Sequence, residues 1–524
     1  MSRKLLKSTA VTGAMTLLSR ISGLVRDMLF AGLIGAGTGV AADAFYVAFR
    51  IPNFLRRIFG EGAFSQSFVP VFAEYKTKYS AAEARAFVDH MTGILGVILF
   101  GVTLAGVIAA PILVMVLAPG FLDDPHKYGL TVQMLRITFP YLFFISLVAM
   151  AAGILNTYGR FGAAAFTPVL LNLSMISAAL WLAPRMDNPV LALAWGVFIA
   201  GVVQLLFQIP FLHGIKMLPR PRLQVRERHH GVMRVFKLML PAMFGVSVAQ
   251  INMLVNTLLA SFLVTGSVSW LYYSDRLMEF PLGVFGIAFA TVLLPGLARR
   301  HARNSQEEFS HLLDWGLRWV FLIALPASVA LMILSEPLLA TFFHFGKFGV
   351  HDVHMSANAL MAFSFGLLGF ILIKVLAPGF YARQDTKTPM RVGVVSLVVN
   401  IILSLLLVIP LKHVGLALAI SISAFVNAGM LFFKLRSHNV YRPLPGWKLF
   451  LARVVLASAI MGAVLYWGAG DVDTWLQAPA VHRIFRLLIW VVIGAAVYLL
   501  TIMAFGVRLK TLLLKKVDGE QTLD

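Results

Sequence analysis

Long apolar segments alternate with short polar or basic segments along almost the whole chain. Segments long enough to cross a bilayer as an α-helix occur about 14 times. They lie at residues 11–36, 40–59, 88–118, 131–157, 162–184, 189–214, 235–264, 268–297, 313–343, 356–382, 390–410, 413–434, 447–469 and 485–506. The chain is 59% hydrophobic and only 13% charged, whereas soluble domains carry roughly 25% charged residues. The pattern therefore predicts an all-α polytopic membrane protein.

The basic residues between these segments show a side preference. Every second connection is rich in Lys and Arg, and the segment 216–237 is the strongest example. The other connections hold few cations and include acidic residues such as Asp123 and Asp471. Because cytoplasmic loops are enriched in Lys and Arg, both termini are predicted to be cytoplasmic. These loops also explain the net charge of +21, so no nucleic-acid partner is expected.

A weak internal repeat indicates two similar halves. Residues 63–70 match 288–295, and residues 155–168 resemble 379–389, at nearly equal shifts of 225 and 223 residues. An even number of helices in each copy would make the two copies parallel. The predicted domains are an N-lobe of six helices at 1–215, a basic cytoplasmic linker at 216–231, a C-lobe of six helices at 232–437, and helices thirteen and fourteen with a cytoplasmic tail at 438–524.

One apolar segment carries a charged face. Asp43, Arg50 and Arg57 recur every seven residues, with Tyr46 and Asn53 between them, so all five share one side of a helix. A charge at the bilayer centre costs roughly 2.5–3.5 kcal/mol on insertion scales. This face is therefore predicted to line a water-filled cavity inside a helix bundle.

Charges recur at equivalent places in both predicted lobes. Arg20, Arg26 and Asp27 lie on one side of the first helix, the eighth helix carries Asp275, Arg276 and Glu279, and the tenth carries Lys374. Arg56 and Arg57 add to the cationic surplus, which suits a phosphate or pyrophosphate because guanidinium groups bind such oxygens in pairs. Alternatively, Arg26 pairs with Asp27 or Asp43, and Arg276 with Asp275 or Glu279, only to neutralise charge during packing.

The sequence offers no sign of catalysis or of a cofactor. It contains no cysteine, which excludes thiolate metal sites, disulfides and cysteine nucleophiles. Motifs of zinc peptidases, P-loop ATPases and serine hydrolases are also missing. His344, His351 and His354 cluster in one predicted outer loop, where solvated histidines are a better interpretation than a metal site. Neither a cofactor nor an enzymatic activity is expected.

Four motifs resemble a known family. They are SRISGLVRD at 19–27, DAFYVAFRIPNFLRRIFGEGAFSQSFVPVFAEYK at 43–76, SVSWLYYSDRLMEFPLGVFGIAF at 267–289 and KVLAPGFYARQDTKTP at 374–389. They are similar to the MurJ (MviN) lipid II flippases of the multidrug/oligosaccharidyl-lipid/polysaccharide exporter superfamily. The resemblance covers essentially the whole chain, including the last two helices.

The resemblance implies a function and a site. The substrate would be lipid II, an undecaprenyl-pyrophosphate-linked disaccharide-pentapeptide, carried from the inner to the outer leaflet of the bacterial cytoplasmic membrane. Transport would follow alternating access of two lobes around a central cationic cavity. The family's charged positions fall on Arg20, Arg26, Asp43, Arg56, Arg57, Glu61, Asp275, Arg276, Glu279 and Lys374. The last two helices, 447–469 and 485–506, would hold the lipid tail.

The resemblance also implies partners and leaves alternatives. Lipid II and membrane lipids are the implied partners, and the chain is expected to be a monomer that associates with the cell-wall synthesis machinery. The membrane potential is the implied energy source. Another exporter of the same superfamily, either a flippase for other lipid-linked oligosaccharides or a cation-coupled drug antiporter, is one alternative. A drug antiporter should show an acidic cavity, and this chain has a basic surplus. A membrane enzyme acting on polyprenyl phosphates is the other alternative, but no acidic or histidine catalytic cluster supports it.

Overall fold

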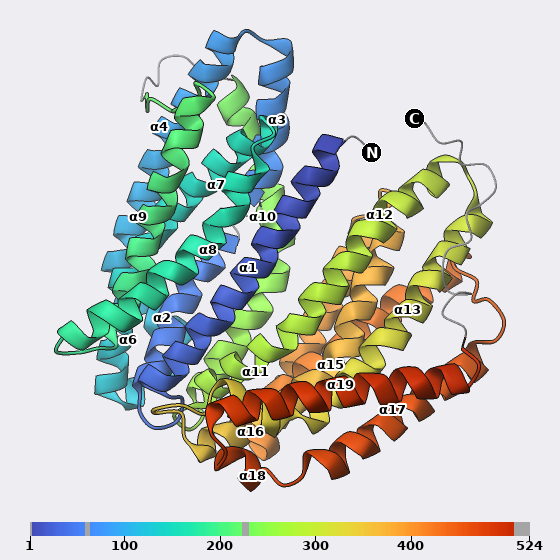
Figure 1. Cartoon of the computed structure of the whole chain (residues 1–524). Coiled ribbons are helices and arrows are strands. Elements are labelled where there is room, and N and C mark those ends of the chain that lie inside the picture. The colour runs from blue at the N-terminus through green and yellow to red at the C-terminus, as the bar shows by residue number, and fades with distance from the viewer. Residues whose placement is uncertain (1–2, 58–62, 223–229, 508–524) are drawn as a thin grey trace. The chain divides into compact units, whose positions relative to one another are not determined.

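The computed structural model describes residues 3–57, 63–222 and 230–507. These residues form helices joined by short connections, and the described part of the chain contains no β-strand (Figure 1). The chain divides into two compact units. Unit 1 comprises residues 1–269 with 345–349, and unit 2 comprises residues 270–344 with 350–524. These units are not the lobes predicted from the repeat, 1–215 and 232–437, whose boundaries stay a prediction.

Unit 1 contains the helices from α1 to α10. They are α1 (Arg3–Ile34), α2 (Ala41–Arg56), α3 (Ser65–Lys78), α4 (Ala81–Ile108), α5 (Ala110–Leu117), η2 (Pro119–Asp123), α6 (Pro125–Thr138), α7 (Tyr141–Thr157), α8 (Phe161–Ser177), η3 (Ala178–Leu182), η4 (Ala183–Arg185), α9 (Leu191–Gly214) and α10 (His230–Ser261). Several begin at strong caps. Ser80 and Glu83 form a reciprocal capping box at the start of α4. Asp124 precedes Pro125, and its side chain accepts the backbone N–H groups of the two residues after that proline, in the first turn of α6.

Unit 2 contains most of α11 and the helices that follow. They are α11 (Ser267–Pro281), η5 (Leu282–Gly286), α12 (Ile287–Ala302), α13 (Gln306–Ile333), α14 (Ser335–Phe342), α15 (Val350–Tyr381), α16 (Lys387–Ser437), α17 (Trp447–Ala469), α18 (Asp473–Leu476) and α19 (Ala480–Ala504). Helix α16 is two helices, because Lys412 interrupts it with φ 50° and ψ −130°. The two predicted segments 390–410 and 413–434 lie on either side of this break.

The prediction of an all-α polytopic membrane protein is confirmed. As far as the structure describes them, the apolar segments predicted to span coincide with one helix or with several consecutive helices. Nine helical stretches there are long and apolar enough to cross a membrane by themselves. Five predicted spans account for the lower number. Helices α2 and α11 are short, α1 carries Arg20, Arg26 and Asp27, α16 combines two predicted spans, and α10 is not among the nine stretches.

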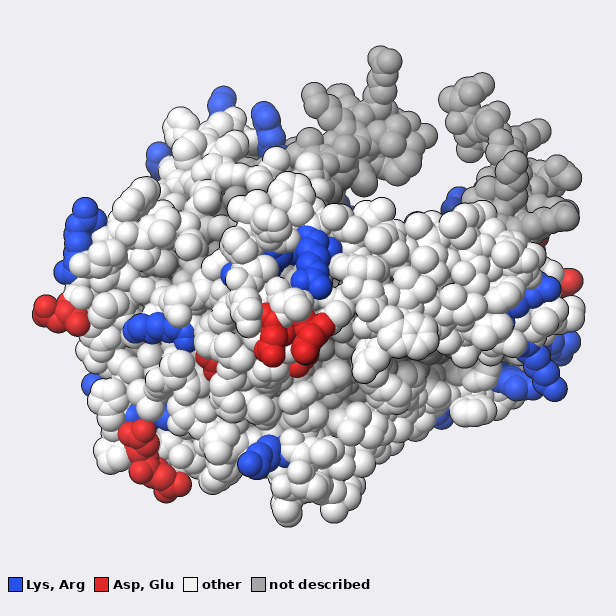
Figure 2. Space-filling model, turned by 60° about the horizontal axis from the view of Figure 1, so that its bottom comes forward, with Lys and Arg blue, Asp and Glu red and all other residues white. Residues whose placement is uncertain are grey.

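The surface supports burial in lipid. Figure 2 shows a face on which uncharged residues predominate and charged side chains form small separate groups. Large apolar side chains are widely exposed on the helices, with Trp467 at 79% and Ile409 at 82%. Exposed apolar surface of this extent is costly in water but not in a bilayer.

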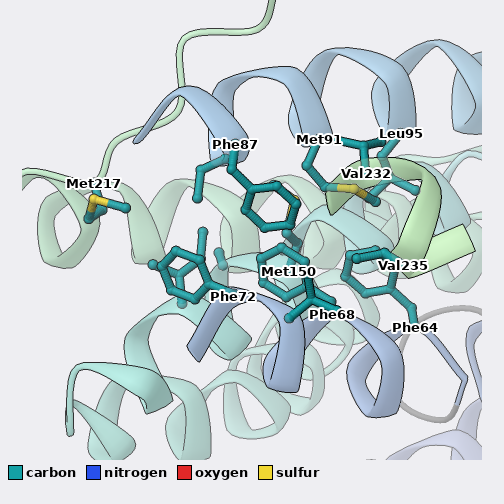
Figure 3. Close-up of a cluster of buried hydrophobic side chains, with 14 of the residues drawn as sticks. Phe64, Phe68, Phe72, Phe87, Met91, Leu95, Met150, Met217, Val232 and Val235 are labelled. Atoms are coloured by element: carbon teal, nitrogen blue, oxygen red, sulfur yellow. The ribbon is translucent and has the colours of Figure 1, made fainter. Parts of the chain in front are cut away.

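An aromatic core holds unit 1 together near α3. Phe64, Phe68 and Phe72 follow at four-residue spacing and stack on one another with ring centroids 5.2 and 5.5 Å apart. Phe87 of α4 stacks on Phe68 at 5.9 Å. Figure 3 shows Val232 and Val235 of α10 beside these rings. This packing is the reason that α10 belongs to unit 1, since stacked aromatic rings and the aliphatic side chains against them bury a large apolar area.

A short loop also belongs to unit 1, although both of its neighbours along the chain belong to unit 2. Residues 345–349 lie against the end of α1, where the Lys347 N–H donates to the Gly32 carbonyl at 3.0 Å. Gly346 has φ +53°, and a Cβ there would overlap with the same carbonyl oxygen. Only glycine therefore fits this close approach.

A buried carboxylate in unit 2 organises the connection between α16 and α17. Asp314 of α13 is fully buried and accepts from the Tyr441 hydroxyl at 2.8 Å, the Leu444 N–H at 3.1 Å and the Trp447 indole at 2.7 Å. Arg318 forms an ion pair with it at 2.8 Å. Burial, followed by the neighbouring Asp314 charge, raises the pKa of Tyr441. These bonds fix the start of α17 to α13, and α17 packs along α13 and α19 (Figure 1).

Candidate functional site

The charged residues of α1 lie in a polar contact with α8. The Arg26 guanidinium donates to Asp27 Oδ1 at 2.6 and 2.9 Å and to Asn172 Oδ1 at 3.0 Å. Asn172 in turn donates to the Ser19 carbonyl and the Ser22 hydroxyl. Arg26 is 6% exposed and Asp27 is fully buried. The local pairing of Arg26 with Asp27, one of the predicted alternatives, is therefore present, while Arg20 on the same helix is half-buried.

Asp43 of α2 is buried and makes several bonds. Its carboxylate is 1% exposed and forms an ion pair with Lys127 of α6 at 2.9 Å. It also accepts from the Gly266 N–H at 2.8 Å and from the N–H and hydroxyl of Ser269 at 3.0 and 2.6 Å. The cluster thus joins α2, α6 and the first residues of α11.

Lys127 is not indicated by hydropathy, because it lies between the predicted spans 88–118 and 131–157. In the structure it lies inside α6 and is 4% exposed, with its ammonium group 4.2 Å from the Phe121 ring centroid. A signal was present in the sequence: Asp124 followed by Pro125 is typical of a helix start. That signal would have placed Lys127 in a helix, although not opposite Asp43.

The other charged residues of α2 lie farther along the same helix. Arg50 donates to the Thr257 hydroxyl of α10, and Arg56 donates to Asn53 Oδ1 at 2.9 Å. Arg57 is half-buried at the end of α2. Glu61, also predicted as a site residue, lies outside the described residues.

Arg56 borders a cavity in unit 1. The cavity has a volume of about 340 Å³ and lies among α7, α8 and α9, with Tyr141, Asn156, Thr167 and Gln204 among its lining residues. The Gln204 amide donates to the Thr167 carbonyl at 2.8 Å. The rest of the cavity wall is mostly apolar. The cavity therefore combines one guanidinium group with a few hydrogen-bonding groups, as ligand pockets commonly do.

The α11 stripe in unit 2 is much more accessible. Asp275, Arg276 and Glu279 are all half-buried, and Arg276 Nη1 lies 3.6 Å from Glu279 Oε2. The pairing of Arg276 with Glu279 is again one of the predicted alternatives. Lys374 of α15 is exposed, and a Cβ added at Gly286 of η5 would lie 3.3 Å from its Cγ. These side chains are therefore accessible to solvent, unlike the Asp43 carboxylate.

Two of the three histidines predicted on the outer side, His351 and His354, contact a tryptophan and an acid. His354 Nδ1 lies 2.8 Å from Glu336 Oε1, and the His351 ring lies edge-on to Trp270. Trp270 donates to Asp352 at 2.8 Å. Among the residues that the structure describes, no group of three or more histidines and acids has the arrangement of a metal site.

Comparison with known proteins gives one consistent family. The family model described as lipid II flippase MurJ matches residues 30–486. A probable lipid II flippase MurJ of Haemophilus influenzae is 46% identical over 514 residues, which cover 96% of this chain and 100% of that protein. The lipid II flippase MurJ of Burkholderia cenocepacia is 44% identical over 506 residues, covering 96% and 98%.

Solved structures support the same fold. A lipid II flippase MurJ in an inward closed conformation matches with a TM-score of 0.80 and 27% identity, covering 95% of this chain and 98% of that one. An inward-facing multidrug resistance transporter of the MATE family and MOP superfamily matches with a TM-score of 0.68 and 15% identity, covering 82% and 98%. The second likeness concerns the fold alone.

Proposed function

The chain belongs to the lipid II flippase MurJ family, and from this membership we propose that it carries lipid II from the inner to the outer leaflet of the bacterial cytoplasmic membrane. The observation that carries the proposal is the 46% identity to a probable lipid II flippase along 96% of this chain and 100% of that relative. The likeness thus extends through both units of the chain. The chain is accordingly a multi-pass membrane transporter, and its substrate serves peptidoglycan synthesis.

The proposed pyrophosphate ligands are Arg20, Arg26, Arg276 and Lys374. The partial exposure of Arg276 and its loose 3.6 Å pairing with Glu279 support this role, because a diphosphate can replace a carboxylate as partner without uncovering a buried charge. Arg26 is held by Asp27 and Asn172 and would have to exchange partners. Asp275 and Glu279 would orient the cations when no substrate is bound.

Alternating access is the proposed mechanism, and Asp43 the proposed latch on the outer side. Its bonds to Lys127, Gly266 and Ser269 hold the start of α11 against α2 and α6. Opening of the outer side would break these bonds. Arg56, Arg57 and Glu61 would meet the headgroup on the cytoplasmic side, where both termini are also proposed to lie.

Three further features belong to the proposal. The chain would act as a monomer without a catalytic step or a cofactor, with the membrane potential as energy source. Helices α17 and α19 would accommodate the polyprenyl tail, which their widely exposed apolar side chains support. Contacts with the cell-wall synthesis machinery would couple translocation to use of the substrate.

Reconstituted vesicles test the proposal. Purified wild-type protein should move lipid II to the opposite leaflet, and R276A should abolish that movement while inserting normally. R299A is the matched control, because Arg299 is an arginine in the last turn of α12 and lies outside the proposed site. Full translocation by R276A would refute its role in binding. Equal transport of lipid II and of another undecaprenyl-linked oligosaccharide by the wild type would favour a less selective flippase.

A further inference from the structure

A small basic cavity in unit 2 lies outside the proposed transport site. It has a volume of about 230 Å³ and opens at the turn between α12 and α13. Three separate parts of the chain supply its basic residues: Arg300 and His301 at the end of α12, Arg383 in the α15–α16 connection, and His438 after α16. None of the proposed lipid II ligands lines it.

Local backbone geometry builds the cavity. Asn304, with φ 52°, reverses the chain between α12 and α13, and the Ser305 N–H donates to the Arg300 carbonyl at 3.0 Å. The Gln306 amide donates to the Asn439 carbonyl at 2.7 Å and thereby fixes the connection that carries His438. The Ser305 side chain does not cap α13, so the first N–H groups of this helix keep their donor capacity.

One of the Arg300 nitrogens lacks an acceptor in the described part of the chain. Its Nη1 donates to the Gly296 carbonyl at 3.2 Å, whereas its Nε is buried and has no hydrogen-bond partner among the described residues. Glu308 Oε2 lies 3.7 Å from this nitrogen, which is beyond hydrogen-bond distance. A buried N–H without an acceptor is unfavourable, so an anion in the cavity would supply the missing oxygen.

Two acidic residues near the cavity have basic partners. Glu308 forms a long ion pair with Arg300 at 3.7 Å, and Glu307 lies 3.9 Å from His311. Asp385, two residues after Arg383, accepts the Thr388 N–H at 3.0 Å. The Thr388 hydrogen bonds and, more weakly, the Arg383 charge lower the pKa of Asp385. Asp385 accepts from the first turn of α16, and within the described residues Arg383 lies near its charge without donating a hydrogen bond to it. The guanidinium and the two imidazoles can therefore donate to a ligand.

We propose that this cavity binds a phosphate group, carried either by an anionic phospholipid headgroup or by a soluble phosphate. A tetrahedral group with three acceptor oxygens matches guanidinium donors from two directions. The volume of about 230 Å³ suits a phosphate ester and is small for a glycopeptide headgroup. The bound group would link the α12–α13 turn to the connections on either side of α16.

Thermal unfolding of the purified full-length chain tests the proposal. Inorganic phosphate is added at constant ionic strength in detergent, and in parallel the protein is placed in nanodiscs of phosphatidylcholine with or without phosphatidylglycerol. Stabilisation by inorganic phosphate identifies a soluble source, and stabilisation by phosphatidylglycerol alone identifies the lipid. R383Q should weaken the apparent affinity roughly tenfold or more, as expected for loss of a charge-assisted bond.

Two variants complete the experiment. R300Q should weaken phosphate binding as R383Q does. The turn between α12 and α13 is not held by the Arg383 side chain in the described part of the chain. R383Q therefore remains informative even if R300Q folds poorly. R436Q is the control, since Arg436 is an exposed arginine near the end of α16 that does not line the cavity. An unchanged response of R383Q, or no response of the wild type to either probe, would overturn the proposal.

Discussion

In unit 1, Asp43 is 1% exposed and forms an ion pair at 2.9 Å, with three further hydrogen bonds. In unit 2, Arg276 and Glu279 form a pair at 3.6 Å with side chains 30% and 42% exposed. Both sets are charged residues on apolar helices, so they are indistinguishable by hydropathy. The first set is buried and bonded inside the protein, whereas the second is half-exposed to solvent.

This difference separates structural from functional consequences of substitution. A buried ion pair loses several kcal/mol when one partner is removed, because the remaining charge stays desolvated. A half-exposed pair contributes little to stability since water screens it. Substitutions can therefore be ranked by the expected loss in free energy of unfolding, and the rank should follow burial rather than charge.

The largest loss is expected for D43A. It would leave Lys127 as an unpaired charge that is 4% exposed, at a cost of about 3–5 kcal/mol. Chemical unfolding of the purified protein measures the effect. D43N combined with K127M should recover much of the loss, because asparagine keeps an acceptor for Gly266 and Ser269 and no buried charge remains. If D43A unfolded at the same denaturant concentration as the wild type, burial would not determine the loss of stability.

D314A should come next and extends the comparison to a buried acid of unit 2. Its removal would leave the Tyr441 hydroxyl, the Leu444 N–H and the Trp447 indole without their acceptor, at a cost of about 2–3 kcal/mol. Limited proteolysis should then cut the connection 438–446 faster, while R442Q, changed only at a neighbouring side chain, should not. Equal cleavage rates would show that Asp314 does not anchor α17.

N172A should have an intermediate effect. It removes one acceptor of Arg26 and the amide that donates two hydrogen bonds from α8 to α1, and polar contacts between membrane helices contribute about 1–2 kcal/mol. Unfolding in detergent measures the loss. S22A, which removes one of those contacts, is the graded control and should lose less. A greater loss for S22A than for N172A would contradict the proposed network.

R276A sharpens the comparison because its two effects should diverge. Its free energy of unfolding should change by less than about 1 kcal/mol, while lipid II translocation should be lost. Unfolding and transport are measured on the same preparation, with E279Q as a control that removes the opposite charge of the pair. If stability and transport fell together, the α11 stripe would be structural like the Asp43 cluster.

The smallest effect concerns an exposed contact of unit 1 and depends on pH. Glu74 of α3 accepts from Lys78 at 3.2 Å and from Arg234 of α10 at 2.8 Å. The bond to Lys78, followed by that to Arg234, lowers the pKa of Glu74 from 4.5. Its stabilisation is therefore present above that value and lost as the pH falls through the lowered pKa.

Wild type and E74Q should accordingly differ slightly in stability at neutral pH and converge under acid conditions. Thermal unfolding across this range measures the difference, and E83Q serves as a control for an exposed acid that caps α4 without bonding another helix. A difference between wild type and E74Q that grew on acidification would have the wrong sign.

Much of the fold and part of the site follow from local sequence. The apolar segments correspond to helices because hydropathy and length act within a single segment, and the membrane class follows from composition. The short-range pair Arg276–Glu279 was also within reach, since residues three apart share one face of a helix. Arg26 and Asp27 are adjacent in the sequence, and their pairing was one of the predicted alternatives.

Tertiary structure alone decided the long-range partners. A charge in an apolar helix signals that it needs a partner, but not which one: Asp43 pairs with Lys127, 84 residues away, and Asp314 binds Tyr441 across 127 residues. The basic cavity around Arg300 likewise needs three connections to meet. Such meetings depend on how whole helices pack, and packing is set by the sum of many apolar contacts rather than by any local pattern.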